Sequence, residues 1–122
     1  TGFEVLLMGG STGGKHQFGA IYDLAATPRN AGKATGQWNT VELRCHGPNI
    51  DVKINGDLVV AMNCDNFDRP GICPDGTKHK YKLSDGPRAV RDFARKGLLG
   101  FQDHGHKVWY KNIKLLELEL NK

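Results

Sequence analysis

Two histidines separated by a single residue are the clearest candidates for acid–base or metal chemistry in this chain. His104 and His106 belong to the run Gln102-Asp103-His104-Gly105-His106. On a strand, two such side chains point to the same side. Histidine titrates near neutral pH and binds metals, so the pair could supply a catalytic base or ligands for a divalent metal. Gln102 and Asp103 could join the histidines in either role, whereas the alternative is a hairpin turn that the histidines only decorate.

Aromatic residues next to polar ones form a second set of candidates. Trp38 precedes Asn39, and Trp109 stands two residues before Lys111. An aromatic plane beside an amide suits a sugar, because CH groups pack on the ring while the amide pairs with hydroxyls. These residues are therefore candidates for carbohydrate contact, and a place in the core is the alternative for each tryptophan.

Two further places combine charge with a position where chemistry is possible. Tyr22 and Asp23 end the strand-like run 17–24. The carboxylate there is a candidate for substrate binding, or it caps the turn that follows. The basic loop 78–96 could bind an anion or stabilise an enolate, and a solvated charged loop is the alternative.

The three cysteines give no metal motif. Cys45 lies in an alternating run, which predicts a buried, small hydrophobic residue. Cys64 and Cys73 bracket a short loop and could form a disulfide in an oxidising compartment, or they could remain thiols. No C-x-x-C pair occurs, which argues against a structural zinc site.

Length and composition limit the class of protein. The 122 residues predict one domain, and 39% hydrophobic with 25% charged residues is an ordinary globular composition. No apolar stretch approaches the roughly 20 residues of a membrane helix. The net charge of +4 comes with acids mixed among the bases, so nucleic acid is not an expected partner. The chain begins at Thr1, so either a leader has been removed or the sequence is part of a longer one.

The elements that must position these residues are strands, because apolar residues recur at every second position. In the run 38–45, Val41, Leu43 and Cys45 are expected to face inward. Asn55-Gly56 predicts a two-residue hairpin turn, since both residues tolerate positive φ. The predicted strands are 2–8, 17–24, 38–45, 49–54, 58–62, 97–102 and 107–120, with Phe3, Val5, Leu7, Ile50, Val52, Ile54, Leu58, Val60 and Met62 facing inward.

Between the fifth and sixth of these strands lies the long loop 65–96, with a short helix expected around Pro87–Lys96 that places Val90, Phe93 and Ala94 on one face. The pattern predicts a single all-β domain over residues 1–122, built as a sandwich or barrel.

Several motifs in order along the chain resemble one known family. They are Gly19-Ala20-Ile21-Tyr22-Asp23, Trp38-Asn39, Ile54-Asn55-Gly56, the run 97–105 (GLLGFQDHG) and the run 108–113 (VWYKNI). Together they resemble the 3-keto-disaccharide hydrolase domain family. The resemblance implies a concanavalin A-like jelly-roll sandwich of antiparallel strands, exported by bacteria to the periplasm or the extracellular space.

The resemblance covers only the C-terminal two-thirds of such a domain. Strands that precede residue 1 in the family are absent from this sequence. A sandwich without them exposes sheet edges, so the chain is either a fragment or is completed by another copy or a partner chain.

The resemblance also implies a reaction on oxidised disaccharides or glycosides. A ketone at C3 of a sugar acidifies the proton on C2; a base removes it, the enolate expels the group on C1, and water adds. His104 is the expected base, and His104→Ala is expected to abolish cleavage of a 3-keto-glucoside. Two alternatives stay open: a carbohydrate-binding module without catalysis, and an assembly domain completed by a partner strand.

Overall fold

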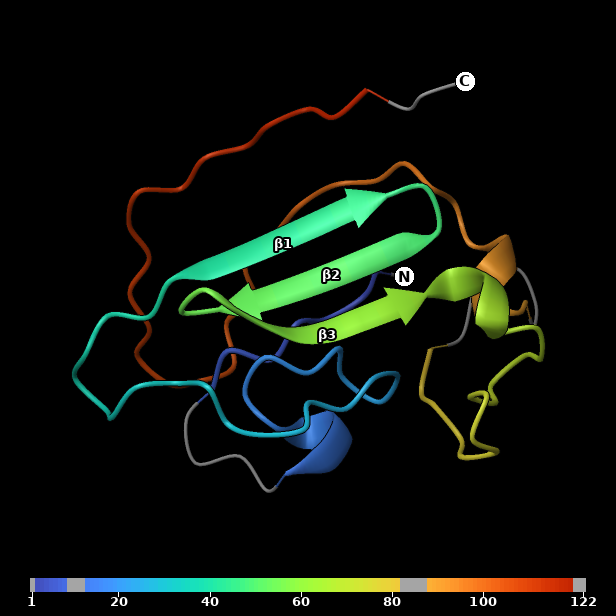
Figure 1. Cartoon of the computed structure of the whole chain (residues 1–122), viewed down its shortest axis with the longest axis horizontal. Coiled ribbons are helices and arrows are strands. Elements are labelled where there is room, and N and C mark those ends of the chain that lie inside the picture. Colours follow the sequence, from blue (N-terminus) through green and yellow to red (C-terminus); the bar gives the residue numbers. More distant parts are fainter. Residues whose placement is uncertain (1, 9–12, 82–87, 120–122) are drawn as a thin grey trace.

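The computed structural model describes residues 2–8, 13–81 and 88–119. In these ranges the regular secondary structure is one antiparallel sheet in the order β1-β2-β3 with short 3₁₀ turns, so the predicted β fold with little helix is confirmed (Figure 1). None of the described residues belongs to a helix with the length and apolarity needed to cross a bilayer. The elements are η1 (Gly14–His16), β1 (Val41–His46), β2 (Asn49–Ile54), β3 (Asp57–Asn63), η2 (Cys64–Asn66) and η3 (Val90–Asp92).

The hairpin between β2 and β3 is confirmed. Asn55 and Gly56 both have positive φ, at 51° and 85°, as a two-residue turn of this type requires. The side chain of Asn55 also accepts a hydrogen bond from the Thr40 N–H and donates one to the Ala31 carbonyl. The turn therefore fixes both the hairpin register and the segment that leads into β1.

β3 departs from the predicted alternation at its start. Val52 pairs with Val60, whereas Lys53 pairs with Leu58, so Val59 is an extra residue in β3. This bulge turns Val59 into the core and leaves Leu58 54% exposed. The prediction that Leu58 faces inward is therefore wrong, while Val60 and Met62 are buried as expected.

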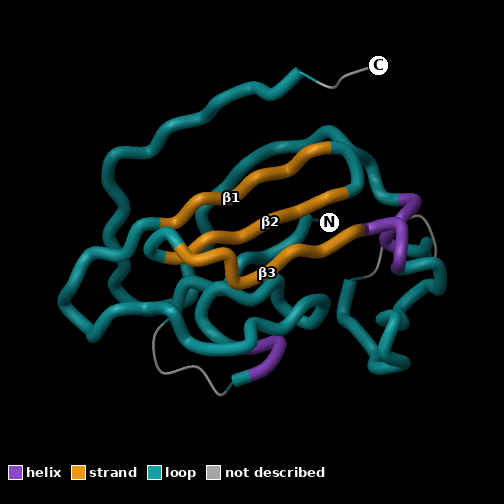
Figure 2. Tube along the Cα trace, viewed as in Figure 1, coloured by secondary structure: helices purple, strands orange, loops and turns teal. Residues whose placement is uncertain are grey.

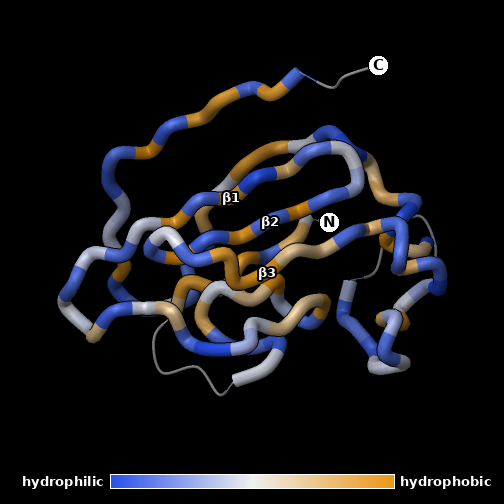
Figure 3. Tube along the Cα trace, viewed as in Figure 1, coloured by the Kyte–Doolittle hydropathy of each residue, from blue (hydrophilic) through white to orange (hydrophobic). Residues whose placement is uncertain are grey.

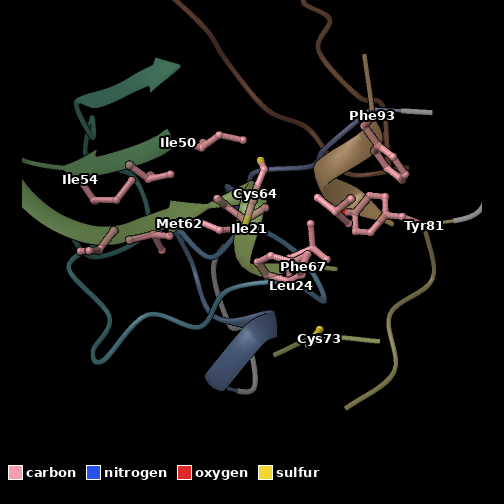
Figure 4. Close-up of a cluster of buried hydrophobic side chains, with 14 of the residues drawn as sticks. Ile21, Leu24, Ile50, Ile54, Met62, Cys64, Phe67, Cys73, Tyr81 and Phe93 are labelled. Carbon is pink, nitrogen blue, oxygen red and sulfur yellow. The ribbon is translucent and has the colours of Figure 1, made fainter. Parts of the chain in front are cut away.

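The first two predicted strands, 2–8 and 17–24, pair with each other but are not regular strands. A single antiparallel bridge joins Val5 to Ile21. Backbone hydrogen bonds run from the Leu6 N–H to the Ala20 carbonyl and from the Tyr22 N–H to the Glu4 carbonyl. Ile21 is fully buried in the same cluster as the side chains of β2 and β3 (Figure 4). This packing holds the turn at Tyr22 against the sheet.

The described parts of the loop 65–96, residues 65–81 and 88–96, send several side chains into the core. Phe67, Tyr81 and Phe93 are all buried in the hydrophobic cluster (Figure 4). The short helix expected at 87–96 is only the 3₁₀ turn η3, in which Val90 is buried, while Ala94 is exposed. Pro87 lies outside the described residues.

Both cysteines that flank the start of this loop are buried, and neither forms a disulfide. Cys64 and Cys73 are free thiols, each 1% exposed. Burial raises the pKa of the Cys64 thiol, because the charged form loses solvation. Both side chains pack in the buried hydrophobic cluster as thiols.

β1 is an edge strand, and its predicted inward face is exposed. Val41, Leu43 and Cys45 pair with Ile54, Val52 and Ile50, so they share a face with buried residues of β2. Nevertheless Val41 and Leu43 are 39% and 42% exposed, and Cys45 is exposed too. The prediction of burial is wrong for these three residues, because no described segment covers this part of the sheet.

The predicted strands 97–102 and 107–120 are not formed. Every residue from 94 to 119 is exposed, and the segment joins no sheet (Figure 2). Apolar and polar residues still alternate along it (Figure 3). A strand needs a neighbour that accepts and donates its backbone hydrogen bonds, and the described part of the chain places none beside this segment. Leu120 lies outside the described residues.

Candidate active site

The best-defined group of reactive side chains contains His16, Asp23, Tyr22, Lys80 and Glu4, which we call the His16–Asp23 centre. His16 ends the turn η1, and Asp23 follows the segment that packs on the sheet. The Nε2 atom of His16 lies 2.7 Å from Oδ1 of Asp23, and the two side chains are 47% and 21% exposed. A solvent-accessible imidazole is thus held by a carboxylate, which is the arrangement of an oriented general base.

The backbone around Asp23 is constrained. Asp23 has a φ of 62°, which residues with a side chain adopt uncommonly. The Lys80 N–H donates to its Oδ2 atom at 3.2 Å, and the Cys73 thiol donates to its carbonyl oxygen at 3.4 Å. The carboxylate that faces His16 is therefore fixed from several directions.

Lys80 brings a positive charge to the same place. Its Nζ atom lies 3.0 Å from both carboxylate oxygens of Glu4 and 4.4 Å from the centre of the Tyr22 ring. The His16 ring stacks on Tyr22 as well, with centroids 4.5 Å apart. One tyrosine thus carries an imidazole and an ammonium, the two groups that proton abstraction beside a carbonyl requires.

Buried groups support this centre from below. The Tyr81 hydroxyl donates to the Tyr22 carbonyl oxygen at 2.8 Å and accepts from the Glu4 N–H at 3.3 Å. Burial raises the pKa of Tyr81 well above its usual range, so the hydroxyl remains protonated. His79 is buried beside it, and neither of its ring nitrogens finds a hydrogen-bond partner within the described residues. Burial lowers the pKa of His79, which keeps this imidazole neutral.

The predicted catalytic turn lies elsewhere, in the exposed C-terminal segment. A shallow hollow of about 350 Å³ is lined by Gln102, Asp103 and His106 together with Phe101, Lys107, Val108 and Tyr110. His104 is exposed, does not line this hollow, and makes no hydrogen bond or ion pair with any described residue. The Asp103 carboxylate accepts the Gly105 N–H at 2.9 Å, which closes a turn.

The predicted sugar-contact residues are partly brought together. The Lys111 ammonium lies 4.1 Å from the centre of the Trp38 ring. Trp109 is 69% exposed. Asn39 is occupied structurally, because its side-chain oxygen accepts from the Lys33 N–H and the Asn55 amide. Tyr22 and Asp23 belong to the His16–Asp23 centre, and no contact joins that centre to Trp38 or to the C-terminal hollow.

Nothing in the described part of the chain resembles a metal centre. No three His, Cys, Asp or Glu side chains gather there closely enough to hold an ion. His104 and His106 alone would supply fewer protein ligands than the three or four typical of protein zinc sites. The metal prediction on these two histidines therefore gains no support from the geometry.

A family model identifies the chain. The model of the 3-keto-alpha-glucoside-1,2-lyase-like domain matches residues 1–116. The chain belongs to this family. The resemblance seen in the sequence is thereby confirmed, and this lyase-like domain is associated with carbohydrates by its family description.

Among solved structures, the lyase-like domain is similar to a protein from Parabacteroides distasonis that is provisionally named a glycosyl hydrolase. The TM-score is 0.56 and the identity 26%, over 68% of this chain. The match spans 41% of the length of that protein. No curated protein matches the chain.

Two residues of the centre were not predicted from the sequence: Glu4 and His16. Lys80 belongs to the basic loop 78–96, for which enolate stabilisation was a prediction, although no single residue was chosen there. Tyr22 and Asp23 stood out only as the polar end of an apolar run. A signal was present at His16, which follows the glycine pair Gly13-Gly14 and stands seven residues before Asp23. Both glycines have positive φ, so that they form the turn that brings the histidine back to the carboxylate.

Proposed function

We propose that this domain cleaves glycosides that carry a ketone at C3 of the sugar, by elimination followed by addition of water. The family match over residues 1–116 carries the proposal. The similarity to a provisional glycosyl hydrolase supports it. We further propose that the complete fold is a concanavalin A-like jelly roll, in which β1-β2-β3 belongs to one layer.

The chemistry follows from the ketone. A base removes the proton from C2, and its electron pair forms a C2–C3 double bond with negative charge on the C3 oxygen. This enolate then expels the oxygen on C1, which takes up a proton, while a C1–C2 double bond forms and the ketone returns. Water adds its oxygen to C1 and a proton to C2. The protein must supply a base near neutral pKa and a positive or hydrogen-bonding group for the enolate oxygen.

The C-terminal hollow is proposed as a surface for sugar contact. Gln102 and Asp103 present an amide and a carboxylate, and the Phe101 and Tyr110 rings lie 4.4 Å apart beside them. Polar groups beside aromatic rings suit a sugar. The sequence nominates His104 as the base, and His104→Ala tests that assignment.

A direct experiment compares two substrates on the protein that carries this domain. Release of 4-nitrophenol from 4-nitrophenyl 3-keto-α-glucoside is expected, with none from the glucoside that lacks the ketone. Gln102→Ala is expected to raise KM, and His46→Ala, in β1, is a control outside both sites. Equal hydrolysis of the two glucosides would contradict the elimination mechanism, since only the ketone acidifies C2.

An assembly role has one specific observation in its favour. The edge strand β1 leaves Val41 and Leu43 exposed on the face that is buried in β2. A partner strand that pairs with β1 would satisfy its open edge, and a layer packed on this face would cover the two side chains. This alternative concerns how the domain is completed and is compatible with the reaction.

A further inference from the structure

The base of the proposed elimination is better supplied by another part of the fold than the turn at 102–106. We propose that His16 removes the C2 proton of the 3-keto-glycoside, that Asp23 positions it, and that Lys80 stabilises the enolate. This inference rests on the proposed function. It adds a catalytic assignment that the sequence motifs did not indicate.

The hydrogen bond to Asp23 determines which nitrogen of His16 can act. An ionised carboxylate only accepts hydrogen bonds, so the Nε2 atom, 2.7 Å away, carries the proton in the neutral ring. Nδ1 then carries the lone pair, and it makes no hydrogen bond with any described residue. With the side chain 47% exposed, this lone pair is open to a substrate proton.

Asp23 stabilises the imidazolium that forms when His16 takes the proton. Its second oxygen is held by the Lys80 N–H, and its backbone keeps a φ of 62° through the surrounding contacts. Uncommon backbone conformations cluster at functional sites, where the surroundings over-determine them.

Lys80 brings a positive charge to the same tyrosine as the base. Its ammonium and the His16 ring both contact Tyr22. C2 and the C3 oxygen are neighbours in the sugar, so the proposal requires one substrate at Tyr22 to reach both groups. The Glu4 carboxylate holds the Lys80 ammonium, with Nζ 3.0 Å from Oε1. The ammonium has three protons, so it can still donate a hydrogen bond to a substrate.

His104 lacks each of these features. It has no carboxylate partner and no cation beside it among the described residues. His104 is therefore tested as the competing base, and His46, a histidine in β1 outside both the His16–Asp23 centre and the C-terminal hollow, is the matched control.

The experiment measures 4-nitrophenol release from 4-nitrophenyl 3-keto-α-glucoside by wild type, His16→Ala, His16→Gln, His104→Ala as the test of the competing base, and His46→Ala as the control. Both His16 variants are expected to lose about 10²- to 10⁴-fold in kcat, the usual contribution of a general base. Added imidazole should restore part of the rate in His16→Ala, where it can occupy the space, and not in His16→Gln. The His46→Ala control should keep a kcat within about threefold of wild type.

Positioning and charge are tested in the same assay. Asp23→Asn is expected to lower kcat by roughly tenfold or more with KM unchanged, because an amide can hold the ring in the wrong tautomer. Lys80→Gln should lower kcat, whereas Lys78→Gln, an exposed lysine of the same loop, should not. Circular dichroism of each variant should match wild type, since the centre is at the surface.

Three results would overturn the inference. Wild-type kcat in both His16 variants would exclude His16 as the base. A loss in His104→Ala that imidazole rescues would assign the base to the C-terminal turn. A wild-type protein that cleaves neither the oxidised nor the unoxidised glucoside would refute the proposed function, and this inference with it.

Discussion

Gly19 is the position where a single methyl group should most clearly disturb the platform of the His16–Asp23 centre. A Cβ atom built at Gly19 would lie 2.9 Å from Cγ1 of Ile54 and 3.2 Å from Cγ2 of Val59. Gly19 also has a φ of 89°, and its N–H donates to the Leu6 carbonyl at 2.7 Å. Gly19→Ala therefore combines backbone strain with overpacking against two buried side chains of the sheet.

Gly36→Ala separates these two effects. Gly36 has nearly the same φ, 90°, but nothing lies within 4 Å of the Cβ position. Left-handed backbone costs an L-residue about 1–2 kcal/mol, which both variants share. Overpacking adds about 1–3 kcal/mol in Gly19→Ala alone. The free energy of unfolding should thus fall by about 2–5 kcal/mol at Gly19 and about 1–2 kcal/mol at Gly36.

Urea unfolding followed by circular dichroism measures both losses. A drop of this size is a large share of the stability of a small domain, so the Gly19 variant should show a clearly lower midpoint. Equal losses in the two variants would refute the reasoning, because they would mean that the contact with Ile54 and Val59 is relieved at no cost.

Three further predictions test the surroundings of the site and the open edge. Burial lowers the pKa of His79, so at acidic pH the unfolded protein binds a proton at this residue that the folded protein excludes. The free energy of unfolding should therefore fall as the pH drops below about 6.5. In urea titrations, His79→Phe should remove that part of the loss. Tyr81→Phe leaves the Tyr22 carbonyl without its hydrogen-bond donor, and should lower the free energy of unfolding by about 1–3 kcal/mol and reduce kcat. Unchanged values in both assays would mean that the Tyr81 hydroxyl does not support the His16–Asp23 centre. Leu43→Lys on the exposed face of β1 should reduce concentration-dependent association in sedimentation velocity, whereas Glu42→Lys on the other face should not. A wild-type protein that is monomeric at all concentrations would argue against self-association through β1.

The parts of the fold that the sequence predicted are those whose information is local. The β2–β3 hairpin needs only Asn55-Gly56 and the alternation on either side of it, and all of this lies within a short stretch. The bulge at Val59 was missed because two adjacent valines satisfy either register equally well by hydrophobicity. In the structure Val59 is buried beside Gly19 and Leu58 is exposed. That contact joins residues far apart in the sequence, so the local pattern does not predict it.

Alternation along 97–102 and 107–120 predicted strands that the described residues do not form, because alternation carries no information on the partner of a strand. In β1 the same limit has another consequence: Leu43 and Cys45 lie on the predicted face and are still exposed. Which face a residue occupies follows from the period of two, whereas burial requires a second layer, and that layer depends on chain elsewhere.

The site was predicted in part for a similar reason. Asp23 and Tyr22 were candidates because a polar pair ends an apolar run, but apart from His16 the groups that hold them come from distant positions. The Lys80 N–H reaches Asp23 across 57 residues, and Lys80 reaches Glu4 across 76. The clearest sequence motif, at 102–106, drew attention to His104, although the structure orients a different histidine.

The two candidate regions depend on different parts of the fold, which bears on how they could work together. The His16–Asp23 centre is built on segments that pack against β2 and β3, through Gly19 and the Tyr81 hydroxyl. The hollow at Gln102 and His106 belongs to the segment that has no sheet partner in the described chain. A strand that covers β1 and engages this segment would change the position of the hollow without rebuilding the hydrogen bonds around Asp23. Proton abstraction should therefore depend on the packed half of the molecule, and sugar contact on whatever completes the open edge.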